Sequence, residues 1–201
     1  MTECSALLAA ALDNFMTRFA RHFRVLIALP LLAVVGCDKA SFDCTSADAQ
    51  AALIKAAKKD ISGKISQNIK DIQENNPNGA SFGVSMVQQL ADKFTYELTS
   101  VSEVWENDKG DQKSCRGTLA ITVDPDYVRK ADSGRSAVEL SSVADLAAQS
   151  AVEFDAKSRF TQEVDFGINK VDNGKSISAE AGSNFTLFDV VGEVGAYQLL
   201  S

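Results

Sequence analysis

Carboxylates and cysteines are the side chains of this 201-residue chain whose types suit catalysis or ligand binding, since it holds a single histidine. That histidine, His22, lies in an N-terminal stretch rich in arginine and leucine. The rest of the chain therefore lacks the imidazole that Ser-His-Asp and Cys-His catalysis require and that most zinc sites use. These chemistries are excluded for everything after the stretch.

Acidic residues stand in close pairs at two places, Glu103 with Glu106 and Asp124 with Asp126. Two opposed carboxylates carry out glycoside hydrolysis, so a carboxylate-dependent hydrolase is one interpretation. Pairs on strand edges and around a proline turn are more often solvated surface, and nothing in the spacing places two of them across a cleft. The Asp124-Pro125-Asp126 stretch also lacks the glycine and the later glutamate of an EF-hand loop. We expect no catalytic residue, no metal site and no cofactor, and interpret the protein as non-enzymatic.

A positively charged segment followed by an apolar one lies near the N-terminus. Arg18, Arg21 and Arg24 precede residues 25–35, which carry no charge. This order is typical of a secretory signal peptide. At about 1.5 Å per helical residue, about 11 apolar residues cross only about half of a bilayer core, which needs about 20. The segment is too short for a permanent transmembrane helix.

The apolar segment ends in Val34-Val35-Gly36-Cys37. This tetrapeptide resembles the bacterial lipobox, in which an aliphatic residue, a small or aliphatic residue and Gly or Ala precede the lipidated cysteine of a lipoprotein. The resemblance covers residues 18–37 and says nothing about the fold that follows. It implies that the Cys37 thiol carries a diacylglycerol, that cleavage falls before Cys37, and that acylation of the new amine completes a stable anchor. The alternative is an ordinary buried cysteine after a short core helix.

Lipoproteins are sorted partly by the residue after the lipidated cysteine, which here is Asp38. In the best-studied sorting pathway such a residue resembles an inner-membrane retention signal. We therefore expect a lipid-anchored protein on the periplasmic side of the cell membrane, with the inner membrane favoured over the outer one.

The predicted signal peptide and its cleavage site determine the domain boundaries that we expect. Met16 would begin a signal of ordinary length. We divide the chain into a non-native or disordered extension (1–15), a lipoprotein signal peptide (16–36), a tether (37–45) and a single domain (46–201). The chain is acidic, with a formal net charge of −7, and has no basic stripe. Nucleic acid is therefore not an expected partner.

Two cysteines remain after Cys37, namely Cys44 and Cys115. In an oxidising compartment the simplest interpretation is that they pair, which would tie the start of the first helix to a distant strand. Closing such a loop stabilises a fold by roughly 4 kcal/mol in the chain-entropy model. Two free thiols or a thiol redox centre are the alternatives, and neither has a CxxC spacing to support it.

A long amphipathic helix is predicted after the tether, with Thr45 as its N-cap and Asp48 three residues further on. Its apolar positions recur at three- and four-residue steps: Leu53, Ile54, Ala57, Ile61, Ile65, Ile69 and Ile72. Its other face carries Lys55, Lys58, Lys59, Lys64 and Lys70. These lysines are most simply a solvated helix face. A patch for anionic lipid headgroups is the alternative.

The pattern then predicts a short helix over 84–91 and two strands. Phe94, Tyr96 and Leu98 alternate with polar residues, and a slip of this alternation near Ser100 predicts a bulge or bend. A turn at 107–110 leads to a return strand over 114–123. Residues 124–136 are predicted to form a polar loop, and residues 137–154 a helix.

The second half repeats this order. Alternation from Phe160 predicts a strand, Asp172-Asn173-Gly174 a type I′ hairpin turn, and residues 175–181 a return strand. The stretch beginning at Phe94 and the one beginning at Phe160 share a Phe-Thr-x-Glu-aliphatic motif, which is compatible with a duplicated αββ unit. The apolar tail, residues 184–201, is predicted to close the sheet as a strand or helix, with an exposed docking segment as the alternative.

These elements predict an α+β domain in which a long N-terminal helix packs on an antiparallel sheet of about four strands, cystatin-like by analogy of element order. We expect this domain to bind a partner protein, in an assembly, exclusion or inhibitor role. Trp105 and Tyr197 are the candidate partner-binding residues. The alternative function is a small-molecule or lipid-binding domain with a pocket between the helix and a curved sheet.

Overall fold

The computed structural model of the protein describes residues 42–74, 83–182 and 185–200. These residues belong to one compact unit, residues 38–201. The predictions for the signal peptide, the lipidated Cys37, the sorting residue Asp38 and the N-terminal extension lie outside the described residues.

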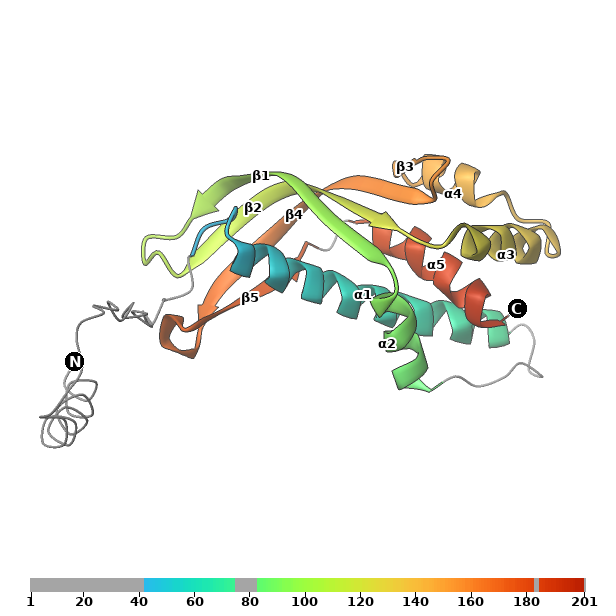
Figure 1. Ribbon diagram of the computed structural model, residues 1–201, viewed down its shortest axis with the longest axis horizontal. Coiled ribbons are helices and arrows are strands. Elements are labelled where there is room, and N and C mark those ends of the chain that lie inside the picture. The colour runs from blue at the N-terminus through green and yellow to red at the C-terminus, as the bar shows by residue number, and fades with distance from the viewer. Residues whose placement is uncertain (1–41, 75–82, 183–184, 201) are drawn as a thin grey trace, which may run out of the picture. The chain divides into compact units, whose positions relative to one another are not determined.

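The described residues of this unit form five helices and five strands (Figure 1). The predicted α+β class is confirmed, including the long helix packed on an antiparallel sheet. In chain order the elements are α1 (Ala47–Glu74), α2 (Val84–Asp92), β1 (Thr95–Glu106), β2 (Gln112–Thr122), α3 (Pro125–Ser136), α4 (Val143–Gln149), β3 (Glu153–Phe154), β4 (Arg159–Val171), a 3-10 turn (Asp172–Gly174), β5 (Ser176–Ala181) and α5 (Leu187–Leu200).

The sheet is four strands wide, because two short strands share one position in it. The order is β1-β2-β4, and all neighbours are antiparallel. On the far side of β4, β3 pairs with Phe160 and Thr161, whereas β5 pairs with the segment from Phe166 to Val171. The prediction of about four strands therefore describes the width of the sheet, and β3 was not predicted.

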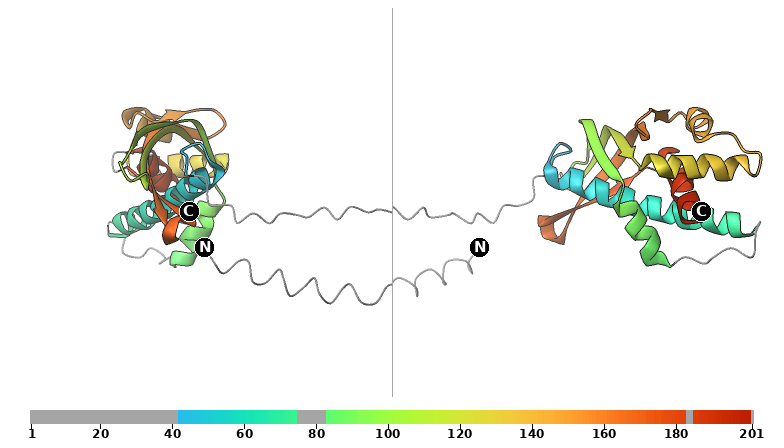
Figure 2. Two further views of the ribbon diagram at one scale, coloured as in Figure 1. Left: turned by 90° about the vertical axis from the view of Figure 1, so that its left-hand side faces the viewer. Right: turned by 45° about the vertical axis from the view of Figure 1, so that its right-hand side comes forward.

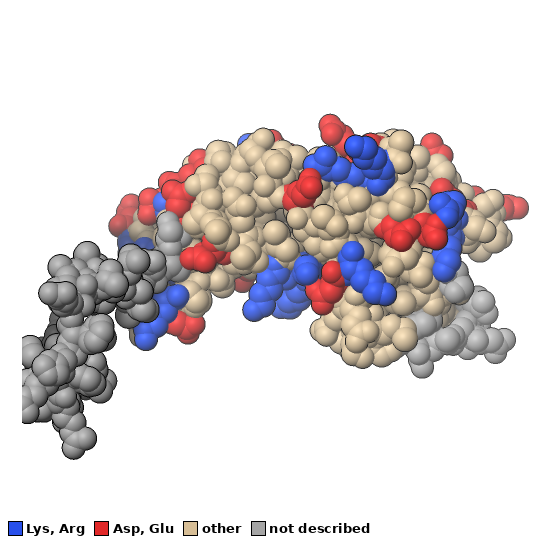
Figure 3. All heavy atoms as spheres, in the orientation of Figure 1, with Lys and Arg blue, Asp and Glu red and all other residues tan. Residues whose placement is uncertain are grey.

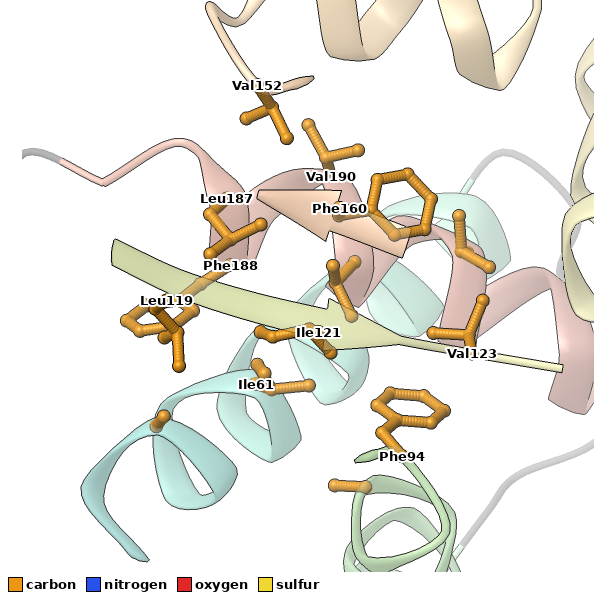
Figure 4. Packing of buried hydrophobic residues seen from close by; sticks show 14 of the residues in the cluster. Ile61, Phe94, Leu119, Ile121, Val123, Val152, Phe160, Leu187, Phe188 and Val190 are labelled. Carbon is orange, nitrogen blue, oxygen red and sulfur yellow. The ribbon is translucent and has the colours of Figure 1, made fainter. Parts of the chain in front are cut away.

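The sheet curls around α1, as the end-on view on the left of Figure 2 shows. One stripe of α1 is buried against the concave face, and most of it follows the predicted spacing: Ala49, Leu53, Ala57, Ile61, Ile65 and Ile69. The facing side chains come from alternate positions of β2 and β4, since successive strand residues point to opposite faces. Figure 4 shows Leu119, Ile121 and Phe160 directed toward Ile61 and α5. Each of these four side chains is completely buried.

The C-terminal tail forms α5, which packs along α1 and α3 and closes the core. Gly192 and Gly195, which weaken the intrinsic helix propensity of this segment, lie where α5 crosses α1. A Cβ built on Gly192 would be 2.6 Å from Lys64 Cβ, and one on Gly195 would be 2.7 Å from Ile65 Cδ1. The two glycines therefore allow the helices to approach closely, and the closing role predicted for the tail is confirmed.

Three predictions of local structure are wrong. Residues 124–136 are not a polar loop: Asp124 caps α3 by accepting from the Asp126 amide at 2.8 Å, and Pro125 takes the first helical position. The helix predicted over 137–154 is confined to α4, because Ala137–Ser142 and Val152 lie outside it. The N-cap of α1 is Ser46, whose Oγ accepts from the Ala49 amide at 3.2 Å, whereas Thr45 donates to Asp43.

The first hairpin follows the prediction, whereas the second is found at the predicted place but with a different turn. Ser100 has a φ of 54°, and the register of β1 against β2 shifts between Thr99 and Ser102, which confirms the bulge. The second turn is longer than a two-residue type I′ turn, since Val171 pairs with Ser176. Asn173 and Gly174 take the positive φ values expected of an Asn-Gly turn, 56° and 81°, and Asp172 also has a positive φ. Duplication of an αββ unit stays a prediction.

Candidate partner-binding site

Cys44 and Cys115 form a disulfide that fixes the beginning of the domain. The predicted pairing is confirmed, and both residues are buried. Next to it the Phe42 ring lies below the ammonium groups of Lys113 and Lys170, at 5.7 and 4.5 Å from the ring centroid. Phe42 and Cys44, which we assigned to the tether, are therefore already packed against the core of the domain.

The two predicted partner-binding residues lie at opposite ends of the domain. Trp105 is opposite Ser114 near the β1–β2 turn, and its side chain is 55% exposed. Cys115, the next residue of β2, is bonded to the N-terminal end of α1. Tyr197 lies in a hollow with Ile72, at the C-terminal end of the same 28-residue helix. A helix of that length spans about 42 Å, so the two aromatic residues do not form one site.

The hollow at Tyr197 is small and partly apolar, with a volume of about 500 Å³. Its rim includes Val138 and Leu140, which are 62% and 51% exposed. The Tyr197 ring packs against Gly134 of α3, where a Cβ would clash with it. Burial, with a smaller contribution from the Glu193 carboxylate, raises the pKa of Tyr197 above its ordinary value. Both effects favour the neutral form of the phenol.

A larger groove, of about 860 Å³, runs between α1 and β5. The helix contributes Ala52, Lys55, Ala56, Lys59 and Asp60, and the strand contributes all of its residues from Ser176 to Ala181. A second hollow of about 440 Å³ continues it toward α5 and shares Lys59, Asp60 and Ala181 with it. We call the two together the α1–β5 groove.

One wall of this groove is a free strand edge. The backbone N–H of Gly182 donates to Asp165 O of β4 at 2.9 Å. Because backbone groups of successive strand residues point to opposite sides, the even-numbered residues of β5 form its backbone hydrogen bonds with β4. The backbone N–H and C=O groups of Ile177, Ala179 and Ala181 consequently point to the other side. Within the described part of the chain, no strand pairs with β5 on that side. The backbone N–H and C=O groups of these three residues therefore face the groove without a pairing strand in the described part of the chain.

The lysines of α1 differ in what they contact. Lys58 forms an ion pair with Asp92 of α2 at 2.9 Å, and Lys64 forms one with Asp189 of α5 at 2.5 Å. These two lysines therefore connect α1 to its neighbouring helices. Among the residues that the structure describes, neither Lys55 nor Lys59 has an ion-pair partner. They are both exposed and line the groove. The predicted solvated face is thus divided between structural pairs and a wall of this groove.

A carboxylate lies at the other end of the groove wall. Burial, together with the nearby Glu180 carboxylate, raises the pKa of Asp60 above its ordinary value, although Lys59 acts in the opposite direction. The groove is accordingly basic toward Lys55 and acidic toward Asp60 and Glu180.

The acid pairs considered for hydrolysis have structural partners. Glu103 and Glu106 both bind Lys113, at 2.5 and 3.5 Å. Asp124 caps α3, and Asp126 pairs with Arg129. Figure 3 shows acidic and basic side chains interspersed over one face of the domain. In residues 42–74, 83–182 and 185–200, no group of three or more His, Cys, Asp or Glu side chains is placed to hold a metal ion.

None of the helices in the described segments is long and apolar enough to cross a membrane. Comparisons with protein-family models, with curated proteins and with solved structures found no match for this chain.

Sequence reasoning missed the α1–β5 groove. Its walls come from segments more than 110 residues apart, and α1 and β5 meet only because the sheet curls around α1. The available sequence signals were weak: Ala52 and Ala56 beside Lys55 and Lys59, and a segment over 176–181 with mostly small side chains and a single charge.

Proposed function

We propose that this chain is a bacterial lipoprotein, anchored through Cys37 on the periplasmic side of the cell membrane, whose domain binds a partner protein and has no catalytic activity. The anchor is inferred from the signal-like residues 18–36 and from the lipobox resemblance that ends at Cys37.

The observation that carries the proposal is the disulfide between Cys44 and Cys115. Disulfides persist in oxidising compartments such as the bacterial periplasm and are rare in the reducing cytosol. A buried disulfide in the domain therefore supports export, which the signal-like segment would bring about. The two features come from different parts of the chain and point to the same compartment.

The short connection to the anchor limits where the domain can act. Only residues 38–41 separate Cys37 from the packed Phe42, and five Cα-to-Cα steps span at most about 18 Å. A lipid on Cys37 would therefore hold the Phe42 end of the domain within about 18 Å of the membrane surface, so we expect the partner to act at the membrane as well.

Binding of a protein is favoured over binding of a buried small molecule because the space between α1 and the sheet is filled. Ile61, Leu119 and Phe160 occupy it (Figure 4), and all three are fully buried, as are Leu53 and Ile65 of α1. The hollows described above are surface grooves, a shape that suits a protein segment better than an enclosed ligand. A small-molecule pocket and a carboxylate-dependent hydrolase remain the alternatives.

Metabolic labelling with a fatty-acid analogue tests the anchor. We expect the full chain to incorporate the label and Cys37→Ala to lose it. Cys44→Ala/Cys115→Ala is the matched control, since it removes the two cysteines that stay in the mature chain outside the lipobox, and it should keep the label. Label that survives in Cys37→Ala, or intact chain recovered from a soluble reducing fraction with its leader attached, would contradict the proposal.

Membrane fractionation tests the sorting residue. We expect wild-type protein mainly in the inner membrane and Asp38→Ser shifted toward the outer membrane. Equal distribution of both proteins would remove the role assigned to Asp38 and leave the anchor itself untouched. Affinity capture of the tagged protein from membranes then tests for a stoichiometric protein partner.

A further inference from the structure

We propose that the α1–β5 groove binds the partner as an added β-strand: an extended acidic segment pairs with the open edge of β5 and lies along α1. The inference rests on the proposed protein-binding function and specifies which part of a partner is recognised. Strand addition beside a helix uses main-chain hydrogen bonds for affinity and the flanking side chains for selectivity.

The edge of β5 is suited to this pairing, whereas the opposite edge of the sheet is not. Register in the β4–β5 ladder is regular throughout. In β1 the register shifts twice, and this strand carries three glutamates, Glu97, Glu103 and Glu106. Bulges and charges are the features by which natural edge strands avoid pairing with other chains. The single charge of β5, Glu180, leaves its edge largely unprotected.

The groove has the length of a short strand. Six residues of β5 extend about 20 Å at about 3.3 Å per residue. The α1 wall from Ala52 to Lys64 extends about 18 Å at about 1.5 Å per residue. Ala52 and Ala56 contribute only methyl groups to this wall, so the backbone of an added strand has room beside the helix. A segment of about five or six residues fits these dimensions.

The lysines of the groove favour an added segment that carries a carboxylate. Lys55 and Lys59 are four residues apart on one helix face, so they repel each other. Neither has an ion-pair partner in the described part of the chain, whereas Lys58 and Lys64 are both paired. A carboxylate of the added segment relieves this repulsion. Because Asp60 and Glu180 make the far end of the groove acidic, the carboxylate belongs at the Lys55 end.

Residue 179 allows the pairing to be blocked selectively. The Ala179 amide points to the open edge, so proline at this position removes an outward donor without removing a β4–β5 ladder bond. The probes are peptides selected from a phage-displayed library of random dodecapeptides, panned against the full chain in detergent. We expect the selected peptides to be enriched in Asp and Glu. Their affinity should fall at least about tenfold in Ala179→Pro, which loses both hydrogen bonding and access at the edge.

Charge variants provide a second, independent arm. Lys55→Glu/Lys59→Glu should weaken the same peptides about tenfold, as expected for loss of a close charge pair. Lys70→Glu is the matched control, because Lys70 is an exposed lysine of α1 outside the groove, and it should change affinity by less than about twofold. Amide hydrogen exchange supplies a readout that does not depend on variants. On peptide binding the amides of Ile177, Ala179 and Ala181 should become protected, while those of Ser178 and Glu180 are protected already.

Failure of any peptide to enrich, equal binding by Ala179→Pro, or protection at β1 instead of β5 would each overturn the inference. These outcomes are distinct from failure of the proposed function. Lipid labelling at Cys37 and recovery of a membrane partner do not involve β5. A partner that binds Ala179→Pro normally would leave the lipoprotein proposal in place and move the binding site elsewhere.

Discussion

Cys44 and Cys115 are 71 residues apart in sequence, and the disulfide that joins them brings their Cα atoms within 5.8 Å. Cys44 lies three residues before Ala47, the first residue of α1. Cys115 lies within β2, directly opposite Glu103 of β1 and Phe166 of β4. The bond therefore fastens the start of the longest helix to a central strand of the sheet that curls around it.

Replacing both cysteines by serine should lower the free energy of unfolding by about 4 kcal/mol, the chain-entropy value for a loop of this length. For a domain of this size that corresponds to a fall in Tm of about 10 °C. Thermal unfolding followed by circular dichroism measures the effect. Reductant should lower the Tm of the wild type by a similar amount and leave Cys44→Ser/Cys115→Ser unchanged; a reductant-sensitive double variant would contradict this explanation.

Gly192→Ala should destabilise the domain by about 1–3 kcal/mol, although alanine is the better helix former. The added Cβ would lie 2.6 Å from Lys64 Cβ, so α1 and α5 would have to separate. Urea unfolding measures the difference. Gly63→Ala is the control, because a Cβ on this exposed α1 residue has nothing within 4 Å. Gly63→Ala should raise the free energy of unfolding by up to about 1 kcal/mol. If Gly192→Ala raised the free energy of unfolding as well, α1 and α5 would be packed less closely than described.

Tyr96→Phe should lower stability at pH 7 by about 1 kcal/mol, because the Tyr96 hydroxyl donates to Ala91 O at 2.9 Å. Burial, reinforced by the Asp92 carboxylate, raises the pKa of Tyr96 in the folded protein. The unfolded phenol ionises near pH 10, so the stabilisation is complete below that pH and is lost as the pH rises further.

The stability difference between wild type and Tyr96→Phe should therefore shrink when urea unfolding is repeated above pH 10. Tyr127→Phe controls for the loss of a phenol from the same core. A difference for Tyr96→Phe that is constant between pH 7 and pH 11 would mean that its hydroxyl is not buried in the folded state.

Arg135→Ala should lower the free energy of unfolding by about 3 kcal/mol, because it leaves the Glu193 carboxylate of α5 without its cationic partner. The Arg135 guanidinium, only 4% exposed, pairs with Glu193 and donates to Ser141 O at 2.5 Å, which holds the α3–α4 connection against α5. Arg129→Ala, on the same helix but at the surface, is the control and should cost less than about 1 kcal/mol. Urea unfolding separates the two, and comparable losses would place Arg135 at the surface.

The periodic parts of the chain could be predicted because burial imposes a spacing on them. The stripe from Leu53 to Ile69 and the alternation from Phe160 to Ile168 both follow the geometry of their element. The failures occurred where one or two residues decide the outcome. Asp124 and Pro125 lie in a stretch that was predicted to be a loop, whereas they begin α3. Val138 and Leu140 lie in a stretch that was predicted to be a helix, whereas both are exposed and lie outside α4.

The candidate site shows the same division. Sequence alone supplied the cysteines, the absence of histidine after residue 22, and the aromatic residues Trp105 and Tyr197. It could not supply the distance between those two residues, nor the meeting of α1 with β5.

The sequence by itself determined the class of fold, the confirmed disulfide and the chemistries that are excluded, because each depends on residue type and local spacing. Within the described residues, tertiary structure alone decided which strand edge has no pairing strand and which lysines of α1 form no ion pair. Both are properties of segments that are distant in the chain, and the curl of the sheet around α1 places them side by side.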